Sequence, residues 1–211
     1  MYNKIIDNLS KMQIEAFCVN NASEAREKVI EIIEKKRMEC RKSPNEMQVS
    51  WGGSVTLDET GIRKKCSEIY KTLDPYAPKT PSEQNEAKRK ALLSDVFLMS
   101  ANAICESGEI VNIDGNGNRL SALIFGPNTV IIVAGKNKIV PDVKGAYERI
   151  KKIACPKNAQ RLKRATPCAL NGACKSCKEP GQTICAHTVI TRFSTIPDRI
   201  KVIIIDDDFG Y

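Results

Sequence analysis

Four cysteines stand close together late in the chain, in the spacing Cys-x5-Cys-x2-Cys-x7-Cys. They are Cys168, Cys174, Cys177 and Cys185, and Cys155 precedes the first of them by thirteen residues. A Cys-x2-Cys pair lets two sulfurs reach one metal from a tight turn, so the spacing fits a four-thiolate zinc site or an iron–sulfur cluster. We predict that these four sulfurs converge on one centre, with Cys155 as the reserve ligand. Free thiols and a reversible disulfide are the alternatives.

The segment that carries these cysteines has almost no residues that could build a hydrophobic core. Between Cys168 and Cys185 the only large aliphatic residues are Leu170 and Ile184. Ordering each residue costs about 1–2 kcal/mol of backbone entropy, whereas burying two such side chains returns only about 1.5–3 kcal/mol each. Metal ligation contributes on the order of 10 kcal/mol and would order the segment. The only histidine, His187, is expected in a strand, although a mixed Cys/His site stays open.

A strongly basic window overlaps this segment. Ten Lys or Arg residues lie between Lys144 and Lys178, against the single acid Glu148, while the whole chain carries a net charge of +8. The window predicts a nearby anionic partner, and the alternative is a solvated basic helix face. It has a single aromatic residue, Tyr147, rather than an interleaved aromatic pattern, and no nucleic-acid motif, so a small anionic ligand is favoured over nucleic acid.

Two turns rich in small and polar residues could form a binding crevice. Gly52, Gly53 and Ser54 follow an expected strand at 48–51 and precede a helix. Exposed backbone N–H groups and a hydroxyl can bind an anion there, although a tight turn with a helix cap is the simpler interpretation. The second turn, at 100–109, contains Glu106, which is either a carboxylate that faces the ligand or a solvated turn residue.

The hydrophobic pattern indicates an α/β fold. Apolar β-branched runs alternate with helical stretches, which predicts a largely parallel sheet flanked by helices. The expected strands are 15–19, 48–51, 96–99, 109–113, 129–133 and 201–205, and the expected helices are 4–12, 23–36, 56–70 with a break at Gly61, 82–94, 119–125, 143–153 and 158–164. We expect one domain over 1–211, with a mainly helical part at 1–46 and a cysteine-rich excursion at 155–185.

Composition limits the class of protein. The 211 residues are 42% hydrophobic and only 5% aromatic, so a mostly aliphatic core is expected. The longest apolar run, around 130–134, is far shorter than the ~20 residues that cross a bilayer, and the first residues lack the apolar stretch of a signal peptide. We therefore expect a cytoplasmic protein without a membrane span, whose cysteines are thiols or metal ligands rather than disulfides.

An ordered series of short motifs resembles the lactate-utilisation (LUD) domain family, DUF162. The resemblance is closest to its short clostridial-type members related to lactate-utilisation protein C. The series is Gly53-Ser54-Val55-Thr56, Asp95, Ser100-x-Asn102-Ala103-Ile104-x-Glu106-x-Gly108, Asn112-x-Asp114-Gly115, Gly126-Pro127, Gly135-Lys136-Asn137-Lys138-Ile139-Val140 and Asp206-Asp207-Asp208-Phe209-Gly210-Tyr211.

This resemblance implies a fold similar to the ribose-phosphate isomerase, glucosamine-phosphate deaminase and CoA-transferase group, with the ligand at the carboxyl ends of parallel strands. It implies that Ser54 and Glu106 share one crevice, with Glu106 as the candidate catalytic base. The other implied ligand-binding residues are Gly52, Gly53, Thr56, Asn102, Gly108, Asp114, Lys136 and Lys138.

The function implied by the resemblance is an accessory or subunit in the oxidation of lactate, linked to iron–sulfur electron transfer. Iron–sulfur oxidation subunits and a second copy of the chain are the expected protein partners. Two alternatives stay open. One is a stand-alone isomerase- or transferase-type enzyme that uses Glu106, and the other is a metal-binding or redox-sensing module.

Overall fold

Six parallel strands form the central sheet. The computed structural model of the chain describes residues 2–179 and 183–211. In spatial order the strands are β1 (Glu15–Val19), β10 (Ile200–Ile205), β7 (Thr129–Gly135), β4 (Val96–Met99), β2 (Gln48–Trp51) and β3 (Lys71–Leu73). All five strand pairs are parallel, which confirms the predicted fold class.

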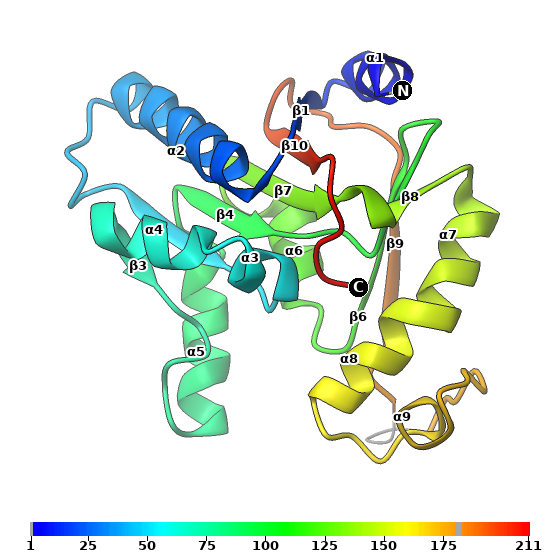
Figure 1. The fold of residues 1–211 in the computed structure, drawn as a ribbon. Helices are drawn as coiled ribbons and strands as arrows, with labels where there is room; N and C mark the ends of the chain where they lie inside the picture. Colours follow the sequence, from blue (N-terminus) through cyan, green and yellow to red (C-terminus); the bar gives the residue numbers. More distant parts are fainter. Residues whose placement is uncertain (1, 180–182) are drawn as a thin grey trace.

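Helices cover both faces of this sheet (Figure 1). One face packs against α2 (Ala22–Glu39), α3 (Val55–Glu59) and α4 (Ile62–Ile69), and the other against α1 (Asn3–Lys11), α5 (Pro81–Ala91) and α6 (Asn118–Phe125). Every residue of β4 and β7 is therefore buried. A strand covered on both faces needs apolar side chains at every position, so these strands are uninterrupted apolar runs in the sequence.

A second, smaller sheet stands beside the first. Its strand order is β8 (Ile139–Val140), β5 (Ala103–Cys105), β6 (Ile110–Asp114) and β9 (His187–Thr191), with β5–β6 and β6–β9 antiparallel. It packs against α7 (Val143–Arg149), which continues through a π-helical turn (Ile150–Ala154) into α8 (Cys155–Arg161). The sequence did not predict a separate sheet, because strands of two to five residues give little periodicity.

Most predicted elements lie within a few residues of the observed ones. The break expected at Gly61 separates α3 from α4, and Gly61 has a φ of 70°, which only glycine adopts without strain. The cysteine-rich excursion, expected as a loop, contains the short helix α9 (Pro167–Asn171), capped by the Thr166 side chain. Residues 180–182 of that excursion lie outside the described residues.

The carboxyl ends of the parallel strands lie at one edge of the sheet and place four segments together. They are the turn at 52–54 after β2, Ser100 after β4, the 3-10 turn η1 (Lys136–Lys138) after β7, and residues 206–211 after β10. Figure 1 shows this last segment, in red, running between α3 and the second sheet. Among the described residues, no helix combines the length and the apolar character needed to cross a membrane.

Candidate functional site

A pocket of about 1130 Å³ opens at this edge, between the parallel sheet and the second sheet. Its lining is strongly cationic, because seven Lys or Arg side chains face it against two Asp side chains. The basic residues are Arg63, Lys88, Arg119, Lys138, Arg161, Lys163 and Arg164, and the acids are Asp58 and Asp114. Such a lining attracts anions, and three of its cations, Arg161, Lys163 and Arg164, belong to the basic window of the sequence.

One of the lining cations is a buried lysine. The Lys138 side chain is only 3% exposed, and its Nζ donates hydrogen bonds to Thr56 Oγ1 (2.8 Å) and Ser100 Oγ (2.9 Å). Ser100 Oγ also donates to Thr56 Oγ1 at 3.3 Å, and Thr56 Oγ1 donates to the Phe209 carbonyl at 3.3 Å. The amine and the two hydroxyls lie in segments that follow three neighbouring strands: Thr56 in α3 after β2, Ser100 after β4 and Lys138 in η1 after β7.

No carboxylate among the described residues lies within ion-pair distance of the Lys138 amine. Burial, the largest cause, and the positive charges of Arg149 and Arg119 together lower the pKa of Lys138 to about 7, while Glu59 opposes them. Desolvation disfavours the charged form of an amine, and like charges act in the same direction. Lys138 is therefore partly neutral near pH 7.

One wall of the pocket is an ion pair at the end of β6. Arg119 Nε donates to Asp114 Oδ2 at 2.8 Å, and the backbone N–H groups of Asn116 and Gly117 donate to Asp114 Oδ1. The aliphatic part of Arg119 lies over Gly52, where an added Cβ would stand 2.4 Å from Arg119 Cγ. Gly52 is thus needed for the close packing of Arg119 rather than as an exposed donor.

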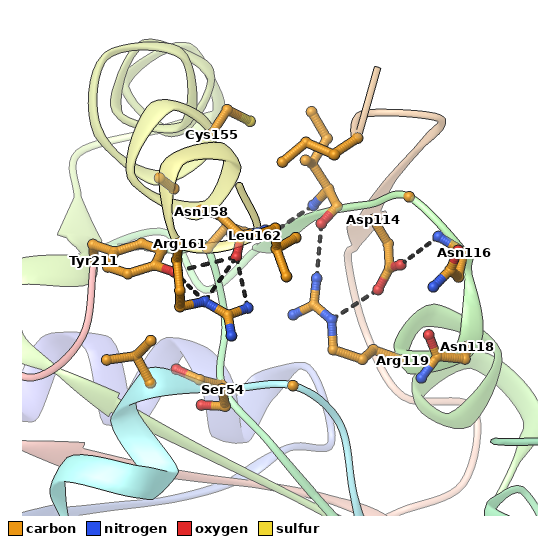
Figure 2. Close-up of a pocket in the computed structure, with 18 of the residues that line it drawn as sticks. Ser54, Asp114, Asn116, Asn118, Arg119, Cys155, Asn158, Arg161, Leu162 and Tyr211 are labelled. Atoms are coloured by element: carbon orange, nitrogen blue, oxygen red, sulfur yellow. Dashed lines mark hydrogen bonds and ion pairs between the residues drawn. The ribbon is translucent and has the colours of Figure 1, made fainter. Parts of the chain in front are cut away.

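The opposite wall comes from α8 and the segment after β10. Arg161 Nε donates to Tyr211 Oη at 2.7 Å, and Tyr211 Oη donates to Asn158 Oδ1 at 3.2 Å. Figure 2 shows this group facing Asp114 and Arg119 across the pocket, with Ser54 below them. Residues from four separate regions of the chain therefore converge on one cavity.

The glycine turn after β2 is already hydrogen-bonded within the protein. The Gly53 N–H donates to Tyr76 Oη at 2.9 Å, and Ser54 Oγ accepts from the Leu57 N–H as the cap of α3. Arg63 donates to the backbone carbonyls of Gly52 and Ser54. The cap interpretation of this turn therefore fits the contacts, and the cations around the turn are the better candidates for binding an anion.

The structure brings part of the predicted ligand-binding set together. Five of these residues line the pocket, namely Gly53, Ser54, Asn102, Asp114 and Lys138, and a sixth, Thr56, accepts a hydrogen bond from Lys138. Lys136, although two residues from Lys138, is exposed and pairs with Asp206 at 3.3 Å outside the pocket. Gly108 also lies outside it, where an added Cβ would meet the Met12 sulfur at 2.7 Å.

The expectation that Ser54 and Glu106 share one crevice is wrong. Glu106 is exposed in the turn between β5 and β6, and its carboxylate lies 4.0 Å from Lys4 Nζ on α1. Its backbone carbonyl accepts a hydrogen bond from Asn8 of the same helix. The physical reason is that the chain leaves the parallel sheet after Ser100 and enters the second sheet, so the turn lies away from the sheet edge.

The cysteines are only partly gathered. Cys155 lines the pocket, and its Sγ lies 3.3 Å from Cys185 Sγ. The hydrogen bond between these thiols lowers the pKa of Cys185 to about 7 and raises that of Cys155. Cys168 Sγ contacts Thr166 Oγ1, and Cys174 Sγ accepts the Ser176 N–H.

Within residues 2–179 and 183–211, no three His, Cys, Asp or Glu side chains are arranged to hold a metal ion. The convergence of Cys168, Cys174, Cys177 and Cys185 on one centre stays a prediction. Of the predicted metal set, Cys155 has the only direct sulfur–sulfur contact in this part of the chain, with Cys185.

Several pocket residues were not singled out from the sequence. Arg119 and Arg63 are in helices whose polar residues are expected to face solvent. Nothing in their spacing indicates that they line a pocket. Arg161 belongs to the basic window, which pointed to an anion without saying which member would meet it. Tyr211 belongs to the motif at 206–211, but its place opposite Arg161 depends on tertiary structure.

Comparison with known proteins agrees with this architecture. The LUD domain family matches residues 2–205, which is nearly the whole chain. A solved structure, a DUF162 family protein from Deinococcus radiodurans, is similar with a TM-score of 0.51 and 15% sequence identity. The alignment covers 96% of this chain and 94% of that one, and at this identity it supports the fold alone. No curated protein matches the chain.

Proposed function

Because the chain belongs to the LUD domain family, we propose that its pocket binds a small carboxylate of the 2-hydroxy or 2-oxo acid type during lactate utilisation. The main support for this proposal is the excess of basic over acidic side chains around one cavity. Its volume of about 1130 Å³ is slightly above the ordinary range of small-ligand sites, about 300–1,000 Å³.

The cations divide into two groups by their contacts. Arg119 and Arg161 are fixed in the walls by Asp114, Asn158 and Tyr211, so they hold a defined geometry. Lys163 and Arg164 lie at the rim, exposed, and make no ion pair within the described residues. The fixed guanidinium groups suit recognition of a planar carboxylate, and the rim charges suit attraction of an anion from solution.

Calorimetric titration with L-lactate, pyruvate and inorganic phosphate tests this proposal. The double variant Lys163→Met/Arg164→Met removes two pocket charges, and Lys151→Met/Lys152→Met removes two exposed charges of the same basic window that do not line the pocket. We expect the pocket variant to weaken carboxylate binding by about tenfold or less and the control by less than about twofold. Equal weakening in both variants would mean that only the overall charge attracts the anion.

A metal centre on the cysteine segment is a second proposal, supported by the cysteine spacing and by the contact between Cys155 and Cys185. An iron–sulfur cluster there would connect the chain to iron–sulfur oxidation subunits by electron transfer, whereas a zinc ion would only order the segment. Two thiols in contact do not complete a four-thiolate site, so no step of ligand binding is assigned to a metal. Metal analysis and an absorption spectrum of anaerobically purified protein test this proposal.

A further inference from the structure

The buried amine of the pocket has the surroundings of a reactive group rather than of a structural cation. We propose that Lys138 Nζ forms an imine with the carbonyl carbon of a 2-oxo acid bound in the pocket. This inference rests on the proposed function, because the carboxylate of that acid would be held by the pocket cations. Lys136 lies on the same 3-10 turn, but it is exposed and pairs with the carboxylate of Asp206, so it is an ordinary surface lysine.

The partners of the amine are hydroxyls, which can reverse the direction of a hydrogen bond. Lys138 Nζ donates to Thr56 Oγ1 and Ser100 Oγ when it is charged. When it is neutral, the Ser100 hydroxyl can donate to the nitrogen instead. A carboxylate partner would hold the lysine protonated, and the described residues place none within ion-pair distance. The site therefore accommodates both the charged and the neutral amine.

Burial and the neighbouring charges also favour the neutral form of the Lys138 amine. The positive charges of Arg149, on α7, and Arg119, on α6, disfavour the charged amine, and Glu59, at the end of α3, is the acid that opposes them. The resulting pKa of about 7 leaves roughly half of the Lys138 amines neutral at pH 7. An ordinary lysine is neutral at about one part in a thousand or less at that pH. Desolvation of this kind is a recognised way to activate a lysine nucleophile.

The reaction balances without an added oxidant or reductant. The neutral nitrogen attacks the carbonyl carbon of the oxo acid and forms a C–N bond, which gives a carbinolamine. Loss of the former carbonyl oxygen with two protons from the amine releases one water and leaves a C=N bond. The Ser100 hydroxyl, 2.9 Å from Nζ, is positioned to carry a proton between nitrogen and oxygen. We assign Ser100 as a catalytic residue for this step, because its hydroxyl contacts the reacting nitrogen.

Access to the amine is from the pocket side. Both Lys138 and Ser100 line the cavity. The segment after β10 closes the other side, because a Cβ added to Gly210 would stand 3.2 Å from Lys138 Nζ and 2.5 Å from Thr56 Oγ1. The carbonyl carbon can therefore approach only along the cavity whose walls carry Arg119 and Arg161.

Reductive trapping tests the inference on the full chain. The protein is incubated at pH 7 with pyruvate and cyanoborohydride, which reduces an imine to a stable amine, and the labelled lysine is located by peptide mass mapping. We expect Lys138 to be labelled at least about tenfold faster than Lys136 because of its larger neutral fraction. Label in Lys138→Met should be lost, and label in Lys136→Met should be unchanged.

Labelling of Lys138 no faster than that of Lys136 in the wild-type chain would overturn the inference, and this comparison does not depend on the folding of any variant. A titration without reductant separates the two proposals. Pyruvate binding without labelling of Lys138 would overturn the imine and leave the binding function. Absence of binding by pyruvate, L-lactate and phosphate would overturn both. The variant Ser100→Ala should slow the labelling by a larger factor than it weakens pyruvate binding, since Ser100 acts on proton transfer as well as lining the cavity.

Discussion

Lys138 Nζ lies 2.9 Å from Ser100 Oγ, although the two residues are 38 positions apart in the sequence. They meet because each follows the carboxyl end of a strand, β4 for Ser100 and β7 for Lys138, and these strands are neighbours in the sheet. The pair stands at the floor of a cationic pocket. This relationship links the topology of the sheet to the chemistry that we propose.

The first prediction concerns the pH dependence of stability. Folding lowers the pKa of Lys138 to about 7, so between about pH 7 and 10 the unfolded chain binds more protons than the folded one. The charged amine therefore destabilises the fold most below pH 7, and this cost falls as the pH rises toward 10. We expect Lys138→Met to raise the free energy of unfolding at pH 7 on the order of 2–4 kcal/mol, and by less at pH 10.

Urea denaturation at the two pH values measures this difference, with Lys136→Met as the control. Lys136 is exposed, so its replacement should change the free energy of unfolding little at either pH. A stabilisation by Lys138→Met that is the same at pH 7 and pH 10 would contradict the assignment of a perturbed amine.

The second prediction concerns the wall of the pocket. Asp114 is buried and pairs with Arg119, whereas Asp58 pairs with Arg63 but is mostly exposed. Removing one partner of a buried pair leaves the other charge uncompensated, so we expect Asp114→Ala to cost about 3–5 kcal/mol. Asp58→Ala should cost less than about 1 kcal/mol. Chemical denaturation of both variants measures the two free energies of unfolding. Similar decreases would contradict the expectation that the buried Asp114–Arg119 pair contributes more to stability than the exposed Asp58–Arg63 pair.

The third prediction concerns the segment after β10. Gly210 and Gly172 both have φ near +65°, so alanine strains the backbone at either position. Only at Gly210 would the new Cβ also collide, with Thr56 Oγ1 at 2.5 Å, while nothing lies within 4 Å at Gly172. We expect Gly210→Ala to reduce both stability and pyruvate labelling, and Gly172→Ala to cost only about 1 kcal/mol. Unchanged labelling in Gly210→Ala would show that the segment does not shape the amine site.

The fourth prediction concerns the cysteine segment. If it holds a metal, anaerobically purified protein should contain stoichiometric zinc or iron, and Cys174→Ser should lose it. Cys40→Ser, at an exposed cysteine far from the segment in sequence, should keep it. Removing the metal with a chelator should make 168–185 sensitive to protease while the sheet survives, because the strands have their own aliphatic core. Full occupancy in Cys174→Ser would contradict the ligand assignment.

The fold was predictable where local pattern and burial agree. Strand β7 is apolar at nearly every position because helices cover both faces of the sheet, so its sequence identifies it. The strands of the second sheet have two to five residues, and their pairing depends on distant partners such as β6 with β9. The predicted position of Glu106 was wrong for this reason, because the passage of the chain from the parallel sheet into the second sheet after Ser100 depends on tertiary structure.

The candidate site was predictable only in part. The ends of parallel strands meet at one edge, so the grouping of Ser54 with Lys138 follows from the fold class. Whether a lysine at such an edge is buried depends on what packs over it, and Lys136 and Lys138 are indistinguishable in the sequence. Likewise, the contact of Arg161 with Tyr211 joins α8 to a segment 50 residues away.

The most direct test of the central claim is to locate a bound carboxylate on the chain by nuclear magnetic resonance. Isotope-labelled protein is titrated with L-lactate and then with pyruvate, and backbone amide shifts are followed. We expect saturable shifts at Ser100, Asn102, Arg119 and Tyr211, which line the pocket, and none at Glu106. Shifts confined to exposed lysines such as Lys151, or centred on the turn at Glu106, would contradict it.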